Sequence, residues 1–407
     1  MTVAQASFTA REGAVCAPAG FRAAGISCGI KKSGAPDVAL IVSESLASAA
    51  AVFTLNKAQA APVLVSKARL ASSSGRARVV AINSGCANAC TGDDGFDTAN
   101  AMADAAAVAV GAGPSEVLIA STGVIGVALD RTRVTNGILN AASALDANGG
   151  SAAARAIMTT DPFPKEAAIT VDSPGGRFSL GGIAKGSGMI EPMMATMLGV
   201  VTTDAAVAPA VLQRALAAAV DVTFNAISVD GECSTNDCVF ALANGASGVT
   251  LGDGDYDLLV ESLRRVCEPL ALGIVRGGEG ATKLVTIDVS GARSAAEAKQ
   301  AARAIANSPL VKTAIHGADP NWGRLIAVAG RAGVDFSLER ARVTIGTAVL
   351  FEDGRPFDER ASDASEHLRR SDISIAVDLG SGGSGAARMW TCDLSAEYVR
   401  INAEYRT

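Results

Sequence analysis

Thr196 is the residue whose type and position most directly raise the question of chemistry. It stands in EPMMATMLGVVTTDA, residues 191–205, where its hydroxyl lies among methionine, leucine and valine side chains. Threonine is common in strands, and a short apolar run without helical period is usually a buried strand, so a structural role is favoured on this segment alone. The other interpretation is a nucleophile, because a threonine at the start of a chain can pass its hydroxyl proton to its own α-amine.

The histidine count restricts the kinds of catalysis open to this chain. Only His316 and His367 occur among the 407 residues, and His367 stands in the charged stretch SDASEHLRRSD, which predicts a solvated helix. A Ser-His-Asp or Cys-His enzyme would therefore depend on His316, in HGADPNWGR. A nucleophilic enzyme of this composition needs another base, and the α-amine of an N-terminal threonine is one.

Composition argues against several other classes of protein. The chain has a net charge of -6, no block of Lys and Arg, and no apolar run long enough to span a bilayer, so we expect neither nucleic acid nor membrane as a partner. Residues 1–20 lack the basic start and apolar core of a signal peptide, which predicts a cytoplasmic protein. The eight cysteines form no CxxC pair, and reduced, buried thiols are favoured over disulfides or zinc ligands.

Candidate catalytic residues must be positioned by helices and strands, and the sequence predicts both kinds of element. Strands are predicted at 77–85, 115–123 and 284–290, and helices at 96–113, 208–220 and 294–308. Four glycine-bearing loops stand out: INSGCANACTG, STGVIG, IAKGSGMIEP and RGGEGATK. None matches a dinucleotide fingerprint or a Walker A loop, and each taken singly is most simply a turn that requires positive φ. We expect an α/β protein of two tightly packed lobes.

Eight motifs that occur in one order along the chain are specific when they are taken together. They are NSGCANACTG (83–92), STGVIG (121–126), MTTDPFPK (158–165), AKGSGMIEPMMATML (184–198), DGECSTND (230–237), GEGATK (278–283), HGADPNWGR (316–324) and the terminal EYVRINAEYRT. This set closely resembles the ornithine acetyltransferase family, the glutamate N-acetyltransferases of the cyclic arginine pathway, over essentially the whole chain. The resemblance implies a layered α-β-β-α sandwich, shared with a group of self-cleaving aminopeptidases.

The resemblance further implies that the precursor cleaves itself between Ala195 and Thr196. The products would be an α chain of residues 1–195, the N-terminal lobe with the oxyanion-hole loop, and a β chain of residues 196–407 that begins with the nucleophile. Cleavage frees the Thr196 amine, whose unperturbed pKa of about 7.7–8.0 suits a base near neutral pH. The scarcity of histidine then has a chemical explanation.

The site residues follow from the same comparison. Thr122 and Gly123 match the family's oxyanion hole. The substrate contacts, besides Thr196 itself, match five residues: Thr159, Lys185, Glu279, Asn402 and Thr407. Taken from the residues alone, Lys185 could be a surface lysine on a turn and Glu279 a solvated turn acid. Thr160 stands beside Thr159, so the register of that contact is open.

The chain also departs from the family's usual pattern at a few positions. Pro162 stands where threonine or serine is common, and Cys233 and Cys238 stand where threonines are more usual. None of these belongs to the proposed catalytic set, and we interpret both cysteines as packing variants. We interpret His316 as structural, in a polar turn under Trp322 at the lobe interface.

The implied activity moves acetyl from N2-acetyl-L-ornithine to L-glutamate through acetyl-Thr196, giving L-ornithine and N-acetyl-L-glutamate. Acetyl-CoA is a candidate second donor, no metal or bound cofactor is implied, and the processed chains are expected to assemble as an α2β2 heterotetramer. Two alternatives stay open. A self-processing aminopeptidase or amidase on the same fold would pass the acyl group to water, and a non-catalytic binding protein would remain uncleaved.

Overall fold

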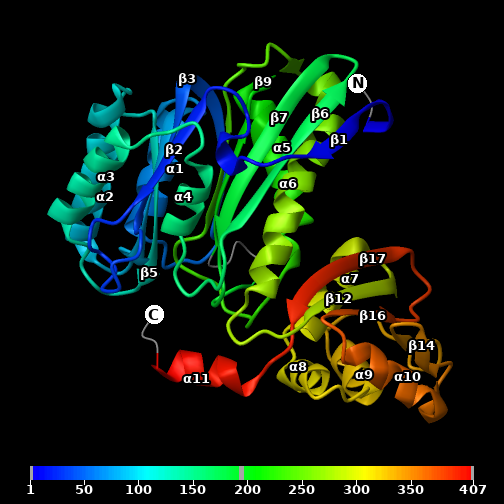
Figure 1. The fold of residues 1–407 in the computed structure, drawn as a ribbon. Helices are drawn as coiled ribbons and strands as arrows, with labels where there is room; N and C mark the ends of the chain where they lie inside the picture. Colours follow the sequence, from blue (N-terminus) through cyan, green and yellow to red (C-terminus); the bar gives the residue numbers. More distant parts are fainter. Residues whose placement is uncertain (1–2, 192–196, 405–407) are drawn as a thin grey trace. The chain divides into compact units, whose positions relative to one another are not determined.

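The structure is a computed structural model that describes residues 3–191 and 197–404 (Figure 1). These residues form two compact units. The larger unit takes its residues from 1–225 and 232–274, and the smaller unit from 226–231 and 275–406. The unit boundary is therefore not the expected boundary between α and β chains, because segments on both sides of residue 195 belong to the larger unit. Within the described ranges, no helix combines the length and apolarity needed to cross a membrane.

A nine-stranded mixed sheet is the centre of the larger unit. Eight strands lie in the order β1 (Ser7–Ala10), β6 (Lys165–Ser173), β7 (Gly176–Lys185), β8 (Leu198–Thr203), β10 (Cys238–Ala243), β3 (Val38–Phe53), β4 (Arg76–Cys86) and β5 (Val117–Val124), and β2 (Phe21–Ile26) pairs with β3. A separate parallel pair is made by β9 (Ala206–Val207) and β11 (Thr250–Leu251). The predicted strands at 77–85 and 115–123 are confirmed as β4 and β5.

Strand β3 joins two halves of this sheet. Its first half, from Val38, pairs with β2 and β4, whereas its second half, from Ser48 to Phe53, pairs with β10. The register of its pairing with β4 shifts between Val42 and Ala47, where the first half of β3 ends and the second half begins. Side chains from both halves share one buried apolar cluster, together with the short helix α4 (Gly150–Ala156). The cluster therefore forms the interior between two layers of strands.

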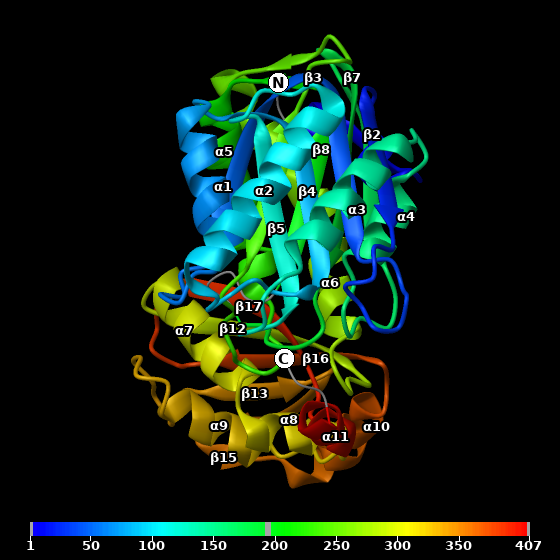
Figure 2. The same cartoon turned by 90° about the vertical axis from the view of Figure 1, so that its left-hand side faces the viewer.

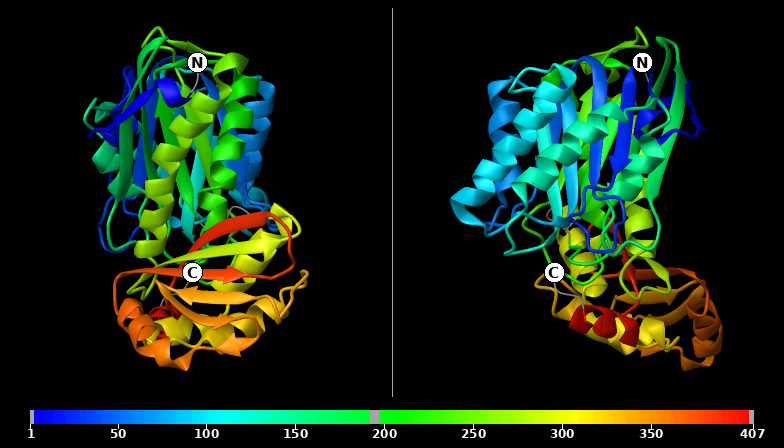
Figure 3. Two further views of the ribbon diagram at one scale, coloured as in Figure 1. Left: turned by 90° about the vertical axis from the view of Figure 1, so that its right-hand side faces the viewer. Right: turned by 60° about the vertical axis from the view of Figure 1, so that its left-hand side comes forward.

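Helices cover the outer faces of both halves. Outside β2–β5 lie α1 (Ala61–Ser72), α2 (Gly92–Val110) and α3 (Arg131–Ser143), which share a second buried cluster with those strands (Figure 2). On the other half lie α5 (Pro209–Asp221) and α6 (Tyr256–Arg276), seen in front of the strands on the left of Figure 3. Helix α6 packs so closely on β7 that a Cβ at Gly182 would lie 2.9 Å from Val266. The mixed α/β class predicted from the sequence is confirmed, and helix–strand–strand–helix layers are found within the larger unit.

The helix α2 shows how local sequence sets the length of an element. It begins at Gly92, before the predicted start at residue 96, because Asp93 and Asp94 lie in its first turn, where negative charge favours the helix dipole. It ends at Val110, before the predicted residue 113, because the next residue is the left-handed glycine Gly111, with φ of 64°.

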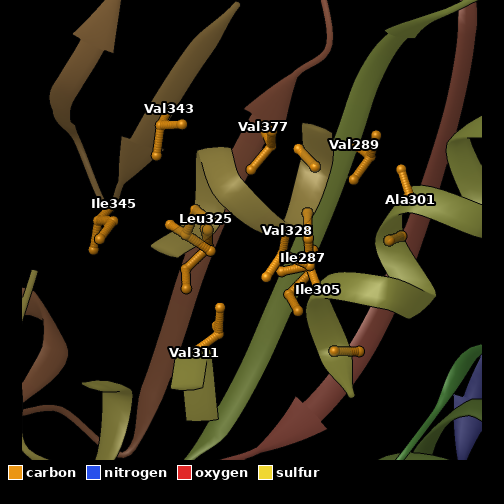
Figure 4. Packing of buried hydrophobic residues seen from close by; sticks show 14 of the residues in the cluster. Ile287, Val289, Ala301, Ile305, Val311, Leu325, Val328, Val343, Ile345 and Val377 are labelled. Carbon is orange, nitrogen blue, oxygen red and sulfur yellow. The ribbon is translucent and has the colours of Figure 1, made fainter. Parts of the chain in front are cut away.

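The smaller unit contains a six-stranded sheet with helices packed on it. Its strands lie in the order β15 (Arg355–Pro356), β14 (Ala348–Glu352), β13 (Arg342–Ile345), β16 (Asp372–Asp378), β12 (Leu284–Ala292) and β17 (Gly385–Cys392). Its helices are α7 (Ala295–Ala306), α8 (Pro309–His316), α9 (Trp322–Gly330), α10 (Ala361–Leu368) and α11 (Ala396–Glu404). The apolar sides of α7, α8 and α9 meet the inward side chains of the sheet in one core (Figure 4). The predicted strand at 284–290 and helix at 294–308 are confirmed as β12 and α7.

Candidate active site

Thr122 and Gly123 lie where β5 comes unusually close to β4. Gly123 has φ of +130° and pairs with Gly85, which has φ of +99°. A Cβ at Gly123 would lie only 2.3 Å from the carbonyl carbon of Gly85, so no other residue fits without moving the backbone. The two glycines thereby bring the backbone of this turn and the hydroxyl of Thr122 into a fixed, buried arrangement, with Thr122 only 2% exposed.

Buried amide side chains hold this turn in place. Ser121 donates its hydroxyl proton to Asn83 Oδ1 over 2.6 Å. The side-chain nitrogen of Asn236 donates to the carbonyl oxygens of Ser121, at 2.9 Å, and Ala87, at 2.6 Å. Since Asn236 precedes β10, this network fastens the turn after β4 and the end of β5 to the other half of the sheet. Buried polar groups that are satisfied in this way rigidify a site.

Lys185, at the end of β7, directs its ammonium to the turn that carries Thr122. Its side-chain nitrogen donates to Thr122 Oγ over 3.2 Å, and the residue is 2% exposed. Among the described residues, no carboxylate oxygen lies within 4.0 Å of the side-chain nitrogen of Lys185, so it forms no ion pair there. The charge of Asp161 acts on Lys185 from a greater distance, but no described carboxylate is in contact with the ammonium, which is therefore suited to an anionic ligand. Because the hydroxyl of Thr122 accepts from Lys185, its own proton is free to be donated elsewhere.

A buried acid fixes the neighbourhood of Lys185. Asp161 is paired with Lys165 and also accepts the backbone N–H of Gly186, at 2.7 Å, and of Thr159, at 2.9 Å. Burial alone would raise the pKa of Asp161, but the charges of Lys185 and Lys165 together with the Gly186 N–H hold it at about 2. Asp161 therefore connects the backbone of Thr159 to that of Gly186, the residue after Lys185. The substrate contact expected of Thr159 stays a prediction.

The start of β8 is anchored by a second buried acid, Asp237. Its Oδ1 accepts the backbone N–H of Met197 over 2.9 Å, and its Oδ2 has no hydrogen-bond partner among the described residues. Burial raises the pKa of Asp237 well above its usual range, although the Met197 N–H and the charge of Lys185 both act to lower it. Ala195 and Thr196 lie outside the described residues, so the expected cleavage site is known here only through the anchored residue that follows it.

Glu279 and Asn402 come together in the smaller unit. Asn402, in α11, donates its side-chain N–H to Glu279 Oε2 over 2.9 Å, and Glu279 is 7% exposed, which excludes a freely solvated turn acid. The neighbouring Gly280 has φ of +68°, and a Cβ there would lie 2.5 Å from the backbone nitrogen of Tyr398. The loop that carries Glu279 is thus packed directly against α11. Thr407, also expected in the substrate site, lies outside the described residues.

His316 is held by a hydrogen bond at the end of α8. Its Nδ1 lies 2.6 Å from Asp393 Oδ2, and Asp393 also accepts from the backbone and hydroxyl of Thr282. Trp322 instead stacks on Phe351, with ring centroids 5.1 Å apart. The hydrogen bond to Asp393 agrees with the structural role expected for His316, which lies at the end of α8 directly before a turn. Cys238 is a core residue of β10, 1% exposed, in line with its interpretation as a packing variant.

Several polar residues of this region had no role assigned from the sequence. Asn83, Asn236 and Asp237 belong to motifs that were recognised as specific, but only their burial and contacts distinguish them from ordinary loop residues. Asp161 and Lys165 likewise stand in MTTDPFPK, where the sequence shows only an acid and a lysine four residues apart and the structure shows that they are buried and paired. The groups gathered in the larger unit are a hydroxyl, a glycine turn and a buried ammonium with no described carboxylate in contact, and an acyl-transfer enzyme uses such groups to bind an anion and a developing oxyanion.

Comparisons with known proteins identify the family. The ArgJ family profile matches residues 22–407. The arginine biosynthesis bifunctional protein ArgJ of Synechococcus is 49% identical over 99% of this chain and 100% of its own length, and that of Synechocystis is 46% identical over 97% of this chain and 98% of its own. A crystal structure of ornithine acetyltransferase from Mycobacterium tuberculosis, complexed with ornithine, is 41% identical and covers 46% of this chain and 98% of that chain, with a TM-score of 0.42.

The family match and the two ArgJ relatives define an α/β acetyltransferase of arginine biosynthesis. The chain belongs to the ArgJ family. The resemblance drawn from the sequence motifs is thereby confirmed, and the non-catalytic binding protein is excluded.

Proposed function

We propose that this enzyme transfers acetyl from N2-acetyl-L-ornithine to L-glutamate in two steps, through an acetyl ester on Thr196. The observation that carries the proposal is the buried ammonium of Lys185, which has no carboxylate partner among the described residues and donates to Thr122. Both amino acids carry an α-carboxylate that can neutralise this charge. One pocket that serves two substrates in turn suits a covalent exchange better than a complex of both.

Self-cleavage comes first. The Thr196 hydroxyl oxygen attacks the carbonyl carbon of Ala195, the acyl group moves from nitrogen to oxygen, and water then hydrolyses the ester. The products are a chain ending at Ala195 and a chain beginning at Thr196 with a free α-amine. The hydrogen bond from Met197 N–H to Asp237 supports this step, because it fixes the peptide unit that joins Thr196 to β8.

The first transfer step uses the same oxygen. The α-amine of Thr196 takes the hydroxyl proton as the oxygen attacks the acetyl carbon of acetylornithine. The tetrahedral oxyanion accepts hydrogen bonds from the Thr122 hydroxyl and the Gly123 N–H, whose positions are fixed by the close approach to Gly85. The carbon–nitrogen bond then breaks, and the leaving α-amine of ornithine takes the proton back. Glutamate reverses this sequence with its own α-amine, which leaves Thr196 free.

The remaining site residues bind substrate in this proposal. Glu279 faces the side-chain ammonium of ornithine, supported by Asn402, which hydrogen-bonds the same carboxylate. Thr159 and the terminal Thr407 complete the contacts. Acetyl-CoA is a second acetyl donor, and two copies of each processed chain form an α2β2 heterotetramer. We also propose a reducing, cytoplasmic location, because the eight cysteines form no CxxC pair.

The first prediction separates transfer from hydrolysis. Purified enzyme incubated with acetylornithine and excess glutamate should release ornithine and N-acetylglutamate in equal amounts, because the acetyl ester is intercepted by the amine. A self-processing amidase would release free acetate under the same conditions. Chromatographic quantification of both acetyl products decides between them, and acetate as the main product contradicts the proposal. A parallel reaction with acetyl-CoA in place of acetylornithine tests the second donor.

A further inference from the structure

Lys31 lies in a loop that is built around a buried acid. Asp37, which is fully buried, accepts the backbone N–H groups of Cys28, at 2.7 Å, Ile30, at 2.7 Å, and Lys31, at 3.0 Å. The backbone N–H of Ser84 donates in turn to the carbonyl oxygen of Asp37 over 2.8 Å. The loop between β2 and β3 is thus fixed beside the end of β4.

The side chain of Lys31 packs over the turn that holds the proposed oxyanion site. A Cβ placed on Gly85 would lie 3.0 Å from Lys31 Cγ, so the aliphatic stem covers that glycine. Gly85 pairs with Gly123, whose N–H is the proposed oxyanion donor. Lys31, in the loop between β2 and β3, and Lys185, at the end of β7, therefore flank one turn of the larger unit.

The ammonium of Lys31 has capacity for an anionic ligand. It donates to the carbonyl oxygen of Pro36 over 2.6 Å, and an ammonium has three protons to donate. Within residues 3–191 and 197–404 it forms no ion pair. The charged groups that act on it are Asp37, Lys185 and Asp161. Burial lowers the pKa of Lys31 to about 8, the two acids oppose this change, and Lys185 adds to it.

We propose that Lys31 binds the side-chain carboxylate of glutamate, the acceptor, while Lys185 binds the α-carboxylate that both substrates share. This inference rests on the proposed function. Glutamate carries two carboxylates, whereas acetylornithine carries one carboxylate and a side-chain ammonium, so a second cation serves the acceptor alone. A site that must admit side chains of opposite charge thereby has a positive group for one of them, in addition to Glu279 for the other.

The two half-reactions test this assignment separately. Ornithine release from enzyme and acetylornithine alone measures the donor step, and decay of the isolated acetyl-enzyme with added glutamate or glutamine measures the acceptor step. The variants are Lys31→Met, which keeps the stem and removes the charge, Lys31→Arg, which keeps the charge, and Lys32→Met, an exposed neighbour, as control. Thermal melting of each variant confirms that it is folded.

We expect Lys31→Met to weaken the acceptor step with glutamate by roughly tenfold or more, the effect of losing one hydrogen bond to a charged group. Its donor step and its reaction with glutamine should stay near wild type, and Lys31→Arg should recover most of the glutamate rate. In the wild type, the KM for glutamate should rise as pH increases through about 8, because Lys31 loses its charge there.

Equal losses in both half-reactions, or in the glutamate and glutamine reactions, would overturn the assignment, because Lys31 would then serve a group common to the substrates. An unchanged glutamate reaction in Lys31→Met would also overturn it. Failure of the wild type to release ornithine from acetylornithine would instead refute the proposed function. The two failures are therefore distinguishable.

Discussion

Thr196→Ala is expected to abolish both chain cleavage and acetyl transfer. The purified variant should run as one intact chain, whereas the wild type should give two chains, 1–195 and 196–407. The reason is chemical, because alanine has no oxygen to accept the acyl group from Ala195 and none to carry acetyl afterwards. N-terminal sequencing together with the mass of the intact protein checks the first effect, and ornithine release checks the second.

Thr196→Ser is the informative companion, since it keeps the hydroxyl and should cleave at least in part. Thr250→Ala, at an exposed strand position, controls for the loss of a threonine as such. Cleavage of Thr196→Ala at residue 195, or wild-type protein that begins only at residue 1 or 2, would contradict self-processing by this residue.

Thr122→Val is expected to lower kcat by on the order of a hundredfold, while KM for acetylornithine changes much less. Valine keeps the shape of the buried threonine but cannot donate to the oxyanion, which carries its charge mainly in the transition state. The substitution also removes the acceptor of the Lys185 ammonium, so some increase in KM is expected. Steady-state kinetics of the processed enzyme measure both values.

Thr122→Ser restores the hydroxyl and should recover most of kcat, which a purely structural role would not require. A change in KM alone, with kcat preserved, would make Thr122 a substrate contact and leave the oxyanion to other donors.

Local sequence was sufficient to predict the elements but not their pairing. Hydrophobic periodicity predicted β4, β5, β12, α5 and α7, because a pattern of apolar residues reports which face of an element is buried. It does not report the neighbouring strand. The division of β3 between two halves of the sheet, and the pairing of Gly85 with Gly123, depend on residues distant in sequence and become visible only in the fold.

The same limit applies to the site. Thr122, Gly123 and Lys185 could be named from motifs, but the contact between Lys185 and Thr122 joins residues 63 positions apart, so sequence alone does not predict it. Asp237 and Lys31 carry no local signal, because an acid or a lysine in a loop is ordinarily solvated. Their burial, and the backbone groups that they bind or that fix them, set them apart.

Compact units and processed chains are also different divisions of the molecule. β7 ends at Lys185 and β8 begins at Leu198, and the two pair as neighbouring antiparallel strands. Cleavage between Ala195 and Thr196 would fall within the segment that connects them. The hydrogen bonds between β7 and β8 would then join the α chain to the β chain, so we expect the two chains to stay associated after cleavage.

The most direct test of the account is the mass of the β chain after reaction with acetylornithine alone. A rapid acid quench should show one added acetyl group on the peptide that begins at Thr196, with about one ornithine released per site in a burst. Glutamate added before the quench should remove that acetyl group and yield N-acetylglutamate. An unmodified β chain, together with ornithine release only when glutamate is present, would contradict the covalent mechanism and leave Thr196 with a role in processing alone.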